Sequence, residues 1–128
     1  MDNSFSERRS FLRVRADIPG HITWGPGSET ITMQTLDISC SGLHCRVSKH
    51  FQPSTRVKIA IILPVSAGGD SRNELVEFEG VVVRSSPEKE EPGIKDYEIA
   101  IFFLGMSDRA RLFVGIYAFE RMLSDSPA

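Results

Sequence analysis

The sequence predicts a mainly β fold: a six-stranded antiparallel β-barrel with a C-terminal α-helix packed against it. Six short stretches read as strands, most of them with the alternation of apolar and polar residues that half-buried strands show, and turn signals rich in Gly, Pro and Ser separate them. The apolar spacing becomes helical near the C-terminus. A chain of 128 residues is long enough for one core but hardly for two. A β-sandwich is the alternative arrangement of the same strands.

The first three strands are expected at 18–24, 29–36 and 43–48. A Gly-Pro-Gly-Ser turn signal at 25–28 separates the first two. The segment 37–42, Asp-Ile-Ser-Cys-Ser-Gly, separates the second from the third. Asp and Ser can cap their own local backbone and Gly tolerates positive φ, so this segment taken alone predicts an ordinary tight bend.

The fourth and fifth strands alternate in the same way and are expected at 56–63 and 74–85. The sixth, at 97–104, is nearly continuous in apolar residues, so both of its faces are expected to be covered. Between these strands we expect a mobile loop at 64–73 and a solvated hairpin loop at 86–95. The fifth strand is long enough to bend, with Gly80 as the candidate position. A helix is expected to follow, with Ser107 as its N-cap and its end near Ser124.

The chain is thus expected to have four parts. Residues 1–7 form a flexible N-terminus, and residues 8–16 form a basic arm that is too charged for a core strand and too short for a helix. Residues 17–123 form the β-domain with its C-terminal helix, and residues 124–128 form a tail.

Composition and charge narrow the classes of function. Hydrophobic residues make up 41% of the chain and charged residues 25%, near the average of globular domains. No apolar run is long enough to span a bilayer and no signal peptide is recognisable, so we expect a cytoplasmic protein. The net charge of −2 argues against a general binder of DNA or RNA.

Cysteines and histidines show no metal or redox pattern. Cys40 and Cys45 are five residues apart, which fits neither a redox pair nor a zinc pair, so we expect reduced, partly buried thiols. His21, His44 and His50 are scattered without the spacing of metal ligands. We therefore expect neither a metal nor a cofactor.

Two polar segments complement each other. Residues 37–42 offer a carboxylate, hydroxyls and an open backbone, whereas residues 8–13 carry three arginines, whose planar guanidinium groups donate in pairs. Together they suit a ligand that carries both phosphates and base edges.

These two segments resemble the signatures of the PilZ domain family of bacterial cyclic di-GMP receptors. The signature R-x-x-x-R is matched at residues 9–13, with Arg8 immediately before it, and D/N-x-S-x-x-G is matched at residues 37–42. Each motif alone is weak. Their joint occurrence, in the family's order and around the first two strands, makes the resemblance specific, and it covers about residues 7–123.

The resemblance implies a cyclic di-GMP-binding module with a PilZ-like split barrel, in which the arm orders on binding and signals to an unidentified downstream protein. Guanine presents N7 and O6 acceptors to an arginine fork, and its N–H donors suit a carboxylate. A hydroxyl can donate to phosphate or base, and a glycine leaves room for the ligand. The implied ligand-binding residues are Arg8, Arg9, Arg13, Asp37, Ser39 and Gly42.

The sequence does not assign a role to every residue near the two motifs. Arg15, Arg46 and Arg84 are interpreted as solvated or rim charges, with a place on the ligand face as the alternative for Arg84. Ala100 stands where the family has a glycine in its sixth strand. In the family, an arginine at the position of Arg8 permits an intercalated ligand pair, so one or two ligands per site remain possible.

Two other functions are alternatives to a nucleotide receptor. The first is a PilZ-like adaptor that acts by protein contact alone, which intact motifs disfavour. The second is an enzyme, because Asp37, Ser39 and His44 contain the residue types of a hydrolytic triad. The sequence offers no oxyanion-hole loop, nucleophile elbow or P-loop, so we expect no enzymatic activity.

Overall fold

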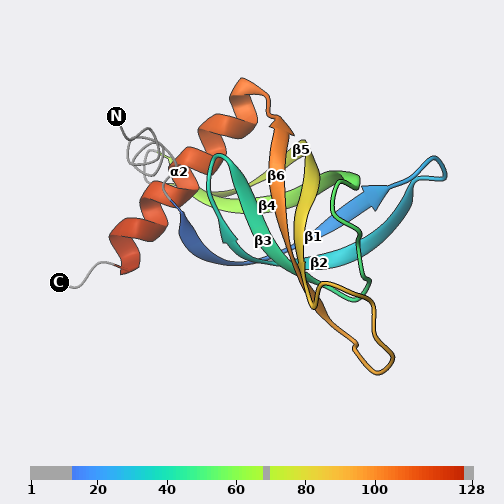
Figure 1. Cartoon of the computed structure of the whole chain (residues 1–128). Coiled ribbons are helices and arrows are strands. Elements are labelled where there is room, and N and C mark those ends of the chain that lie inside the picture. The colour runs from blue at the N-terminus through green and yellow to red at the C-terminus, as the bar shows by residue number, and fades with distance from the viewer. Residues whose placement is uncertain (1–12, 68–69, 126–128) are drawn as a thin grey trace, which may run out of the picture.

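A computed structural model describes residues 13–67 and 70–125 of the chain (Figure 1). Within these two ranges, six strands and one helix follow one another in the order expected. They are β1 (Val14–Trp24), β2 (Glu29–Ile38), β3 (Gly42–Val47), β4 (Arg56–Ala67), β5 (Asp70–Ser86), β6 (Tyr97–Gly105) and α2 (Asp108–Asp125). The helix thus continues one residue past its expected end and includes the first two residues of the expected tail.

All six strands join one sheet that closes into a ring. Every pair of neighbours is antiparallel, the order is β1-β2-β3-β6-β5-β4, and β4 pairs back with β1. The prediction of six antiparallel strands with one C-terminal helix is confirmed. The alternative of two facing sheets is wrong, because the hydrogen-bonded ladder runs round the ring without a break among the described strands.

The core fills the inside of the ring. Because side chains alternate along a strand, one face of each strand points inward and carries β-branched and aliphatic residues. Each fully buried Ile, Leu or Val contributes about 1.5–3 kcal/mol relative to an exposed one. The largest fully buried members are Ile22, Ile38, Leu43, Ile59, Ile61, Leu63 and Ile99.

The helix packs on β4, β5 and β1 (Figure 1). Its buried residues Ala110, Val114 and Tyr117 recur every three or four positions, as one face of a helix requires. The expected N-cap is confirmed, since the Ser107 Oγ accepts a hydrogen bond from the Ala110 N–H at 3.0 Å.

The first strand begins earlier than expected. β1 starts at Val14, so residues 14–16 of the predicted arm belong to the sheet. The Val14 side chain is buried in the core, and Arg15 pairs with Asp37 of β2 while its side chain stays exposed. An irregular register between Arg15 and Ile18 interrupts the alternation, which is why the sequence pattern did not reveal these residues as strand.

The expected mobile loop at 64–73 is mainly strand. Pro64 pairs with Asn73, and Val65, which is buried, pairs with Arg72. Proline has no N–H to donate to a ladder. The ladder between β4 and β1 covers residues 57–61 of β4, so at Pro64 the strand pairs with β5 and needs no donor toward β1. Residues 68–69 lie outside the described part of the chain.

The fifth strand is irregular at Gly80, the position expected for a bend. The register between β5 and β6 shifts between Glu79 and Gly80. A Cβ at Gly80 would lie 2.5 Å from the Ile101 Cγ2 atom and 3.0 Å from the Phe102 carbonyl oxygen. Only glycine lets the two strands approach this closely.

We predict that the two thiols react very differently in the folded protein. Burial raises the pKa of Cys45 to about 12, so almost no thiolate exists at pH 8. Burial also raises the pKa of Cys40, but this thiol is partly exposed and the positive charge of Arg111 opposes the shift. Iodoacetamide at pH 8 should therefore modify Cys40 slowly and leave Cys45 intact, as measured by mass spectrometry.

Unfolding in guanidinium chloride is the control for this experiment, since both cysteines should then be modified rapidly. Equal rates of modification at the two cysteines in the folded protein would contradict the buried position of Cys45.

Candidate ligand-binding site

The site lies where β2 is irregular against both of its neighbours. The register shifts between Arg15 and Ile18 in the β1–β2 pair, and between Thr35 and Asp37 in the β2–β3 pair. Bulges of this kind redirect the side chains beside them. Asp37 consequently lies opposite Arg15 on one side and His44 on the other.

The segment after Asp37 is a tight turn closed by backbone and hydroxyl groups. The Ser39 N–H donates to the Gly42 carbonyl at 2.9 Å, and the Ser41 N–H donates to the Ser39 Oγ at 3.1 Å. The two hydroxyls lie 2.9 Å apart. Ser39 is 0% exposed, so its hydroxyl serves the turn in this conformation. A bend is thus present, but it is shorter than the expected 37–42, because β2 continues to Ile38 and β3 begins at Gly42, which leaves residues 39–41 as the turn.

Gly42 is required by strand packing. A Cβ at this position would lie 2.2 Å from the carbonyl oxygen of Ile101 on β6, and backbone atoms cannot yield that much space. The sequence interpretation gave Gly42 the role of leaving room for a ligand. The structure supplies a separate reason for glycine there, which is the close approach of β3 to β6.

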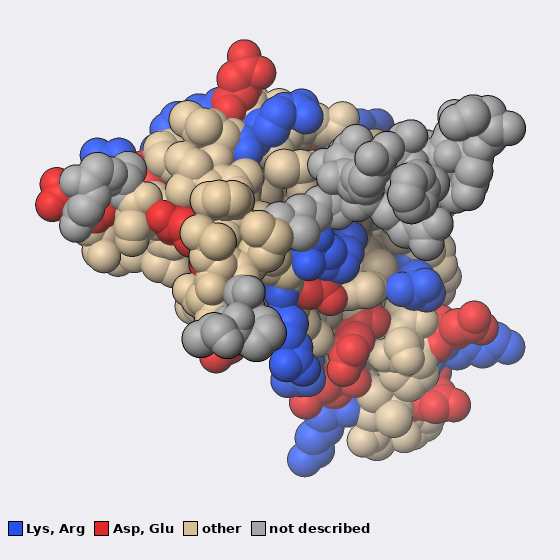
Figure 2. Space-filling model, turned by 90° about the vertical axis from the view of Figure 1, so that its left-hand side faces the viewer, with Lys and Arg blue, Asp and Glu red and all other residues tan. Residues whose placement is uncertain are grey.

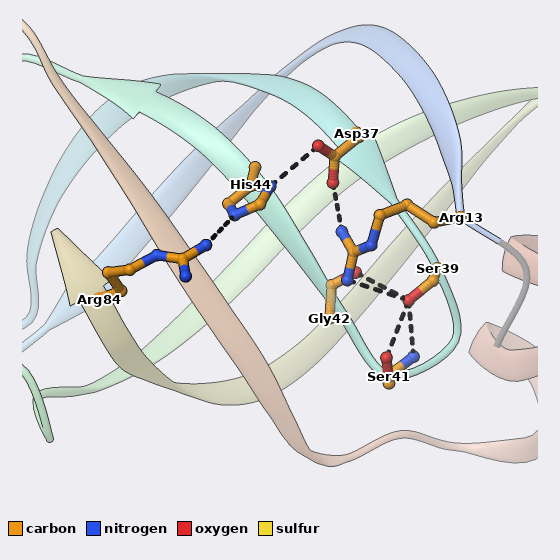
Figure 3. A network of polar contacts seen from close by, with 7 residues as sticks. All are labelled: Arg13, Asp37, Ser39, Ser41, Gly42, His44 and Arg84. Carbon is orange, nitrogen blue, oxygen red and sulfur yellow. Dashed lines mark hydrogen bonds and ion pairs between the residues drawn. The ribbon is translucent and has the colours of Figure 1, made fainter. Parts of the chain in front are cut away.

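Arg13 joins the two sequence motifs in space (Figure 3). Its Nη1 pairs with the Asp37 Oδ1, and its Nη2 donates to the Ser39 Oγ at 3.4 Å. The side chains of Arg13 and Asp37 are 43% and 24% exposed. An ion pair this exposed contributes at most about 1 kcal/mol, so it keeps Arg13 beside Asp37 without locking it. Arg8 and Arg9, the other predicted arginines, lie outside the described residues.

His44 and Arg84 extend the network. Neither is among the site residues expected from the sequence, although a place on the ligand face is the alternative given there for Arg84. The His44 Nδ1 lies 2.9 Å from the Asp37 Oδ2, and its Nε2 lies 3.1 Å from the Arg84 Nη2 (Figure 3). A guanidinium group can only donate, so Nε2 must accept and Nδ1 must carry the proton that is donated to Asp37. His44 therefore links the carboxylate to a second arginine.

A cavity of about 430 Å³ opens beside this network, within the range of small-molecule sites. It is polar at several points and lies on the outer face of the ring. Its lining residues are Arg15, Leu36, Asp37, His44, Arg84, Ser86, Glu98 and Ala100. The structure thus places Arg15 and Arg84 at the cavity, whereas Arg46 lies 3.6 Å from the carboxylate of Glu98 at its exposed edge.

The surface charge is mixed. On the face shown in Figure 2, Lys and Arg side chains are interspersed with Asp and Glu side chains. This agrees with the net charge of −2 and differs from the continuous basic face of a general nucleic-acid binder. Within the described ranges, no helix is both long and apolar enough to cross a membrane.

A carboxylate between an arginine and a histidine, with further arginines at the adjoining cavity, offers hydrogen-bond acceptors and charged donors side by side. The family comparison identifies the class of protein. The model of the PilZ domain matches residues 7–118, and the chain belongs to the PilZ domain family. No protein of curated function matches the chain in sequence.

Three solved structures are similar in fold. MotI/DgrA, the inhibitor of motility of Bacillus subtilis, has a TM-score of 0.74 at 20% identity, covering 94% of this chain and 54% of that one. This chain thus spans about half the length of that protein. The PilZ domain of YcgR from Escherichia coli, solved with c-di-GMP, has a TM-score of 0.64 at 18% identity, covering 91% and 93%. The PilZ domain of CeSA from a cellulose-synthesizing bacterium has a TM-score of 0.55 at 19% identity, covering 84% of this chain and 97% of that one.

We predict that Gly42→Ala destabilises the fold even in the absence of ligand, because its Cβ would overlap the β6 backbone. Overpacking of this kind costs about 1–3 kcal/mol in the free energy of unfolding, which urea denaturation measures.

The matched control is Gly27→Ala in the β1–β2 turn, where an added Cβ meets nothing within 4 Å. This variant should change the free energy of unfolding by no more than about 0.5 kcal/mol. Equal stability of the two variants would show that packing against β6 is not the reason for glycine at position 42.

Proposed function

We propose that the chain is a receptor for cyclic di-GMP: a cytoplasmic binding module that passes its liganded state to a downstream protein. The observation that carries the proposal is the contact of Arg13 with Asp37 and Ser39. It brings together two motifs that are separated by a whole hairpin in sequence. Membership of the PilZ family and the likeness to a PilZ domain solved with c-di-GMP support the same ligand.

The chemistry of guanine fits the groups at this site. Its N7 and O6 atoms accept from an arginine fork, and its ring and exocyclic N–H groups donate to a carboxylate. Arg13 uses one oxygen of Asp37 and His44 uses the other. Each carboxylate oxygen has two lone pairs, so guanine donors can be added while both contacts persist. Arginines of the arm and the cavity then meet the two phosphates.

In this proposal the arm that orders on binding is shorter than the sequence predicts. Arg13 already contacts Asp37, and residues from Val14 onward are part of β1. The segment that orders on binding is therefore residues 8–12, with Arg8 and Arg9 as its ligand-binding residues. The surface formed by this segment, the ligand and the ring is what a downstream protein would recognise.

A binding role is favoured over hydrolysis by the contacts of His44 and Ser39. In a hydrolytic triad the histidine takes the proton of the serine. Here the His44 Nε2 is engaged by Arg84, and the buried Ser39 Oγ is engaged by Arg13 and the turn. A nucleotide-independent adaptor remains the alternative function, and the titration below separates it from a receptor.

We predict that isothermal titration calorimetry detects cyclic di-GMP binding in preference to GTP and cyclic di-AMP, because the amino group of adenine would face the arginine donors. Arg13→Ala should weaken binding by roughly tenfold to over a hundredfold, the cost of about 1.5–3 kcal/mol for a charge-assisted hydrogen bond. Arg13→Lys should lose nearly as much, since the fork geometry is lost.

The control variant for this titration is Arg56→Ala on β4, the strand farthest from β3 around the ring. Its affinity should equal that of the wild type. Absence of any binding to the wild-type chain would favour the adaptor, and equal losses in the Arg13 and Arg56 variants would indicate a diffuse electrostatic attraction.

We predict that cyclic di-GMP slows tryptic cleavage after Arg8 and Arg9, because ligand contacts offset the backbone entropy that ordering costs, about 1–2 kcal/mol per residue. Cleavage after Lys89 in the exposed β5–β6 loop should be unchanged and serves as the internal control. Protection at all three positions would mean that ligand stabilises the whole fold, and protection of the arm without ligand would contradict the ordering step.

A further inference from the structure

The polar network follows one row of the sheet. In the backbone register Arg15 pairs with Asp37, Asp37 with His44, His44 with Ala100, and Ala100 with Arg84. The row thus crosses β1, β2, β3, β6 and β5 in their order around the ring. All five residues are at least partly exposed and line the same cavity.

Ala100 is the small residue in the middle of this row. Neighbouring strands lie about 4.8 Å apart, so β3 and β5, with β6 between them, are separated by roughly 10 Å. The side chains of His44 and Arg84 span this distance and meet at 3.1 Å between Nε2 and Nη2 (Figure 3). The register places Ala100 between their two strands, beneath this contact. A larger side chain at position 100 would fill the space in which they meet.

His44 fixes the groups on both sides of it. Its Nδ1–H holds the Oδ2 of Asp37, and its Nε2 holds one N–H of Arg84. A guanidinium group has five N–H donors, so Arg84 keeps donors for an acceptor group of a ligand. Because Arg84 is already held in place, less side-chain entropy remains to be lost on binding.

We propose that Arg84 is a further ligand-binding residue of this site and that His44 positions it, through a contact that the small side chain of Ala100 permits. The inference rests on the proposed function, since the acceptor group that Arg84 would bind belongs to the nucleotide ligand. Arg15 and Glu98 line the same cavity. Arg46 lies 3.6 Å from the carboxylate of Glu98 and partly balances its negative charge.

The first test needs no ligand. Nitrogen-15 NMR of the histidine side chains in the wild-type chain should show His44 with its proton on Nδ1. Ala100→Val should shift the Nε2 resonance of His44 toward that of an imidazole nitrogen without a hydrogen-bond donor, because the added methyl groups separate Nε2 from Arg84, while the Nδ1–H stays on Asp37. The matched control is Ala60→Val, a partly exposed small residue on β4, which should leave the His44 spectrum unchanged. A His44 spectrum that is identical in Ala100→Val and the wild type overturns the positioning role.

The second test measures affinity for cyclic di-GMP by calorimetry. Arg84→Ala, His44→Leu and Ala100→Val should each weaken binding by about tenfold, the effect of one charge-assisted hydrogen bond. His44→Gln keeps one acceptor and one donor and should recover most of what His44→Leu loses. Arg84→Ala combined with Ala100→Val should be no worse than either change alone, since both remove one contact.

The two possible failures are distinguishable. No binding of cyclic di-GMP to the wild type would overturn the proposed function and, with it, the ligand role of Arg84. Normal binding to the wild type with undiminished binding to Arg84→Ala would overturn this inference alone.

Discussion

The site depends on one carboxylate that is held from both sides. Asp37 gives one oxygen to Arg13 and the other to His44. It can do so because bulges on both flanks of β2 place it opposite Arg15 of β1 and His44 of β3. Without the carboxylate, Arg13 loses its charged partner and keeps the longer contact with Ser39, and the Nδ1–H of His44 loses its acceptor. The orientation of Arg84 would then no longer be fixed.

The closed ring supplies the rigidity that this arrangement needs. The five positions of the polar row belong to strands that are paired on both sides, and their inward neighbours are fully or almost fully buried. The turn at 39–42 adds a second fixed element, since Ser39 is bonded within it and Gly42 fits closely against β6. Groups on strands and tight turns are positioned more accurately than groups on long loops.

The sequence revealed the strand order along the chain, the helix and the two motifs, because each has a local signal of alternation, spacing or turn chemistry. It missed residues 14–16 and the extension around Pro64, where a bulge and a proline mask the alternation. The role of His44 was not predicted from the sequence, and Arg84 was interpreted mainly as a solvated charge. Alternation does place His44 on the outer face beside the motif. Nothing local to Arg84 shows that β6 lies between β3 and β5, so their meeting above Ala100 follows only from the closed topology.

The central claim is that cyclic di-GMP binds on this outer face around Asp37. An NMR titration of nitrogen-15-labelled protein with cyclic di-GMP tests it residue by residue. The account predicts that shift changes concentrate at residues 8–15, at 36–44 and at Arg84, while the amides of β4 at 56–61 stay where they are. Changes centred on β4, or none at any ligand concentration, would contradict it.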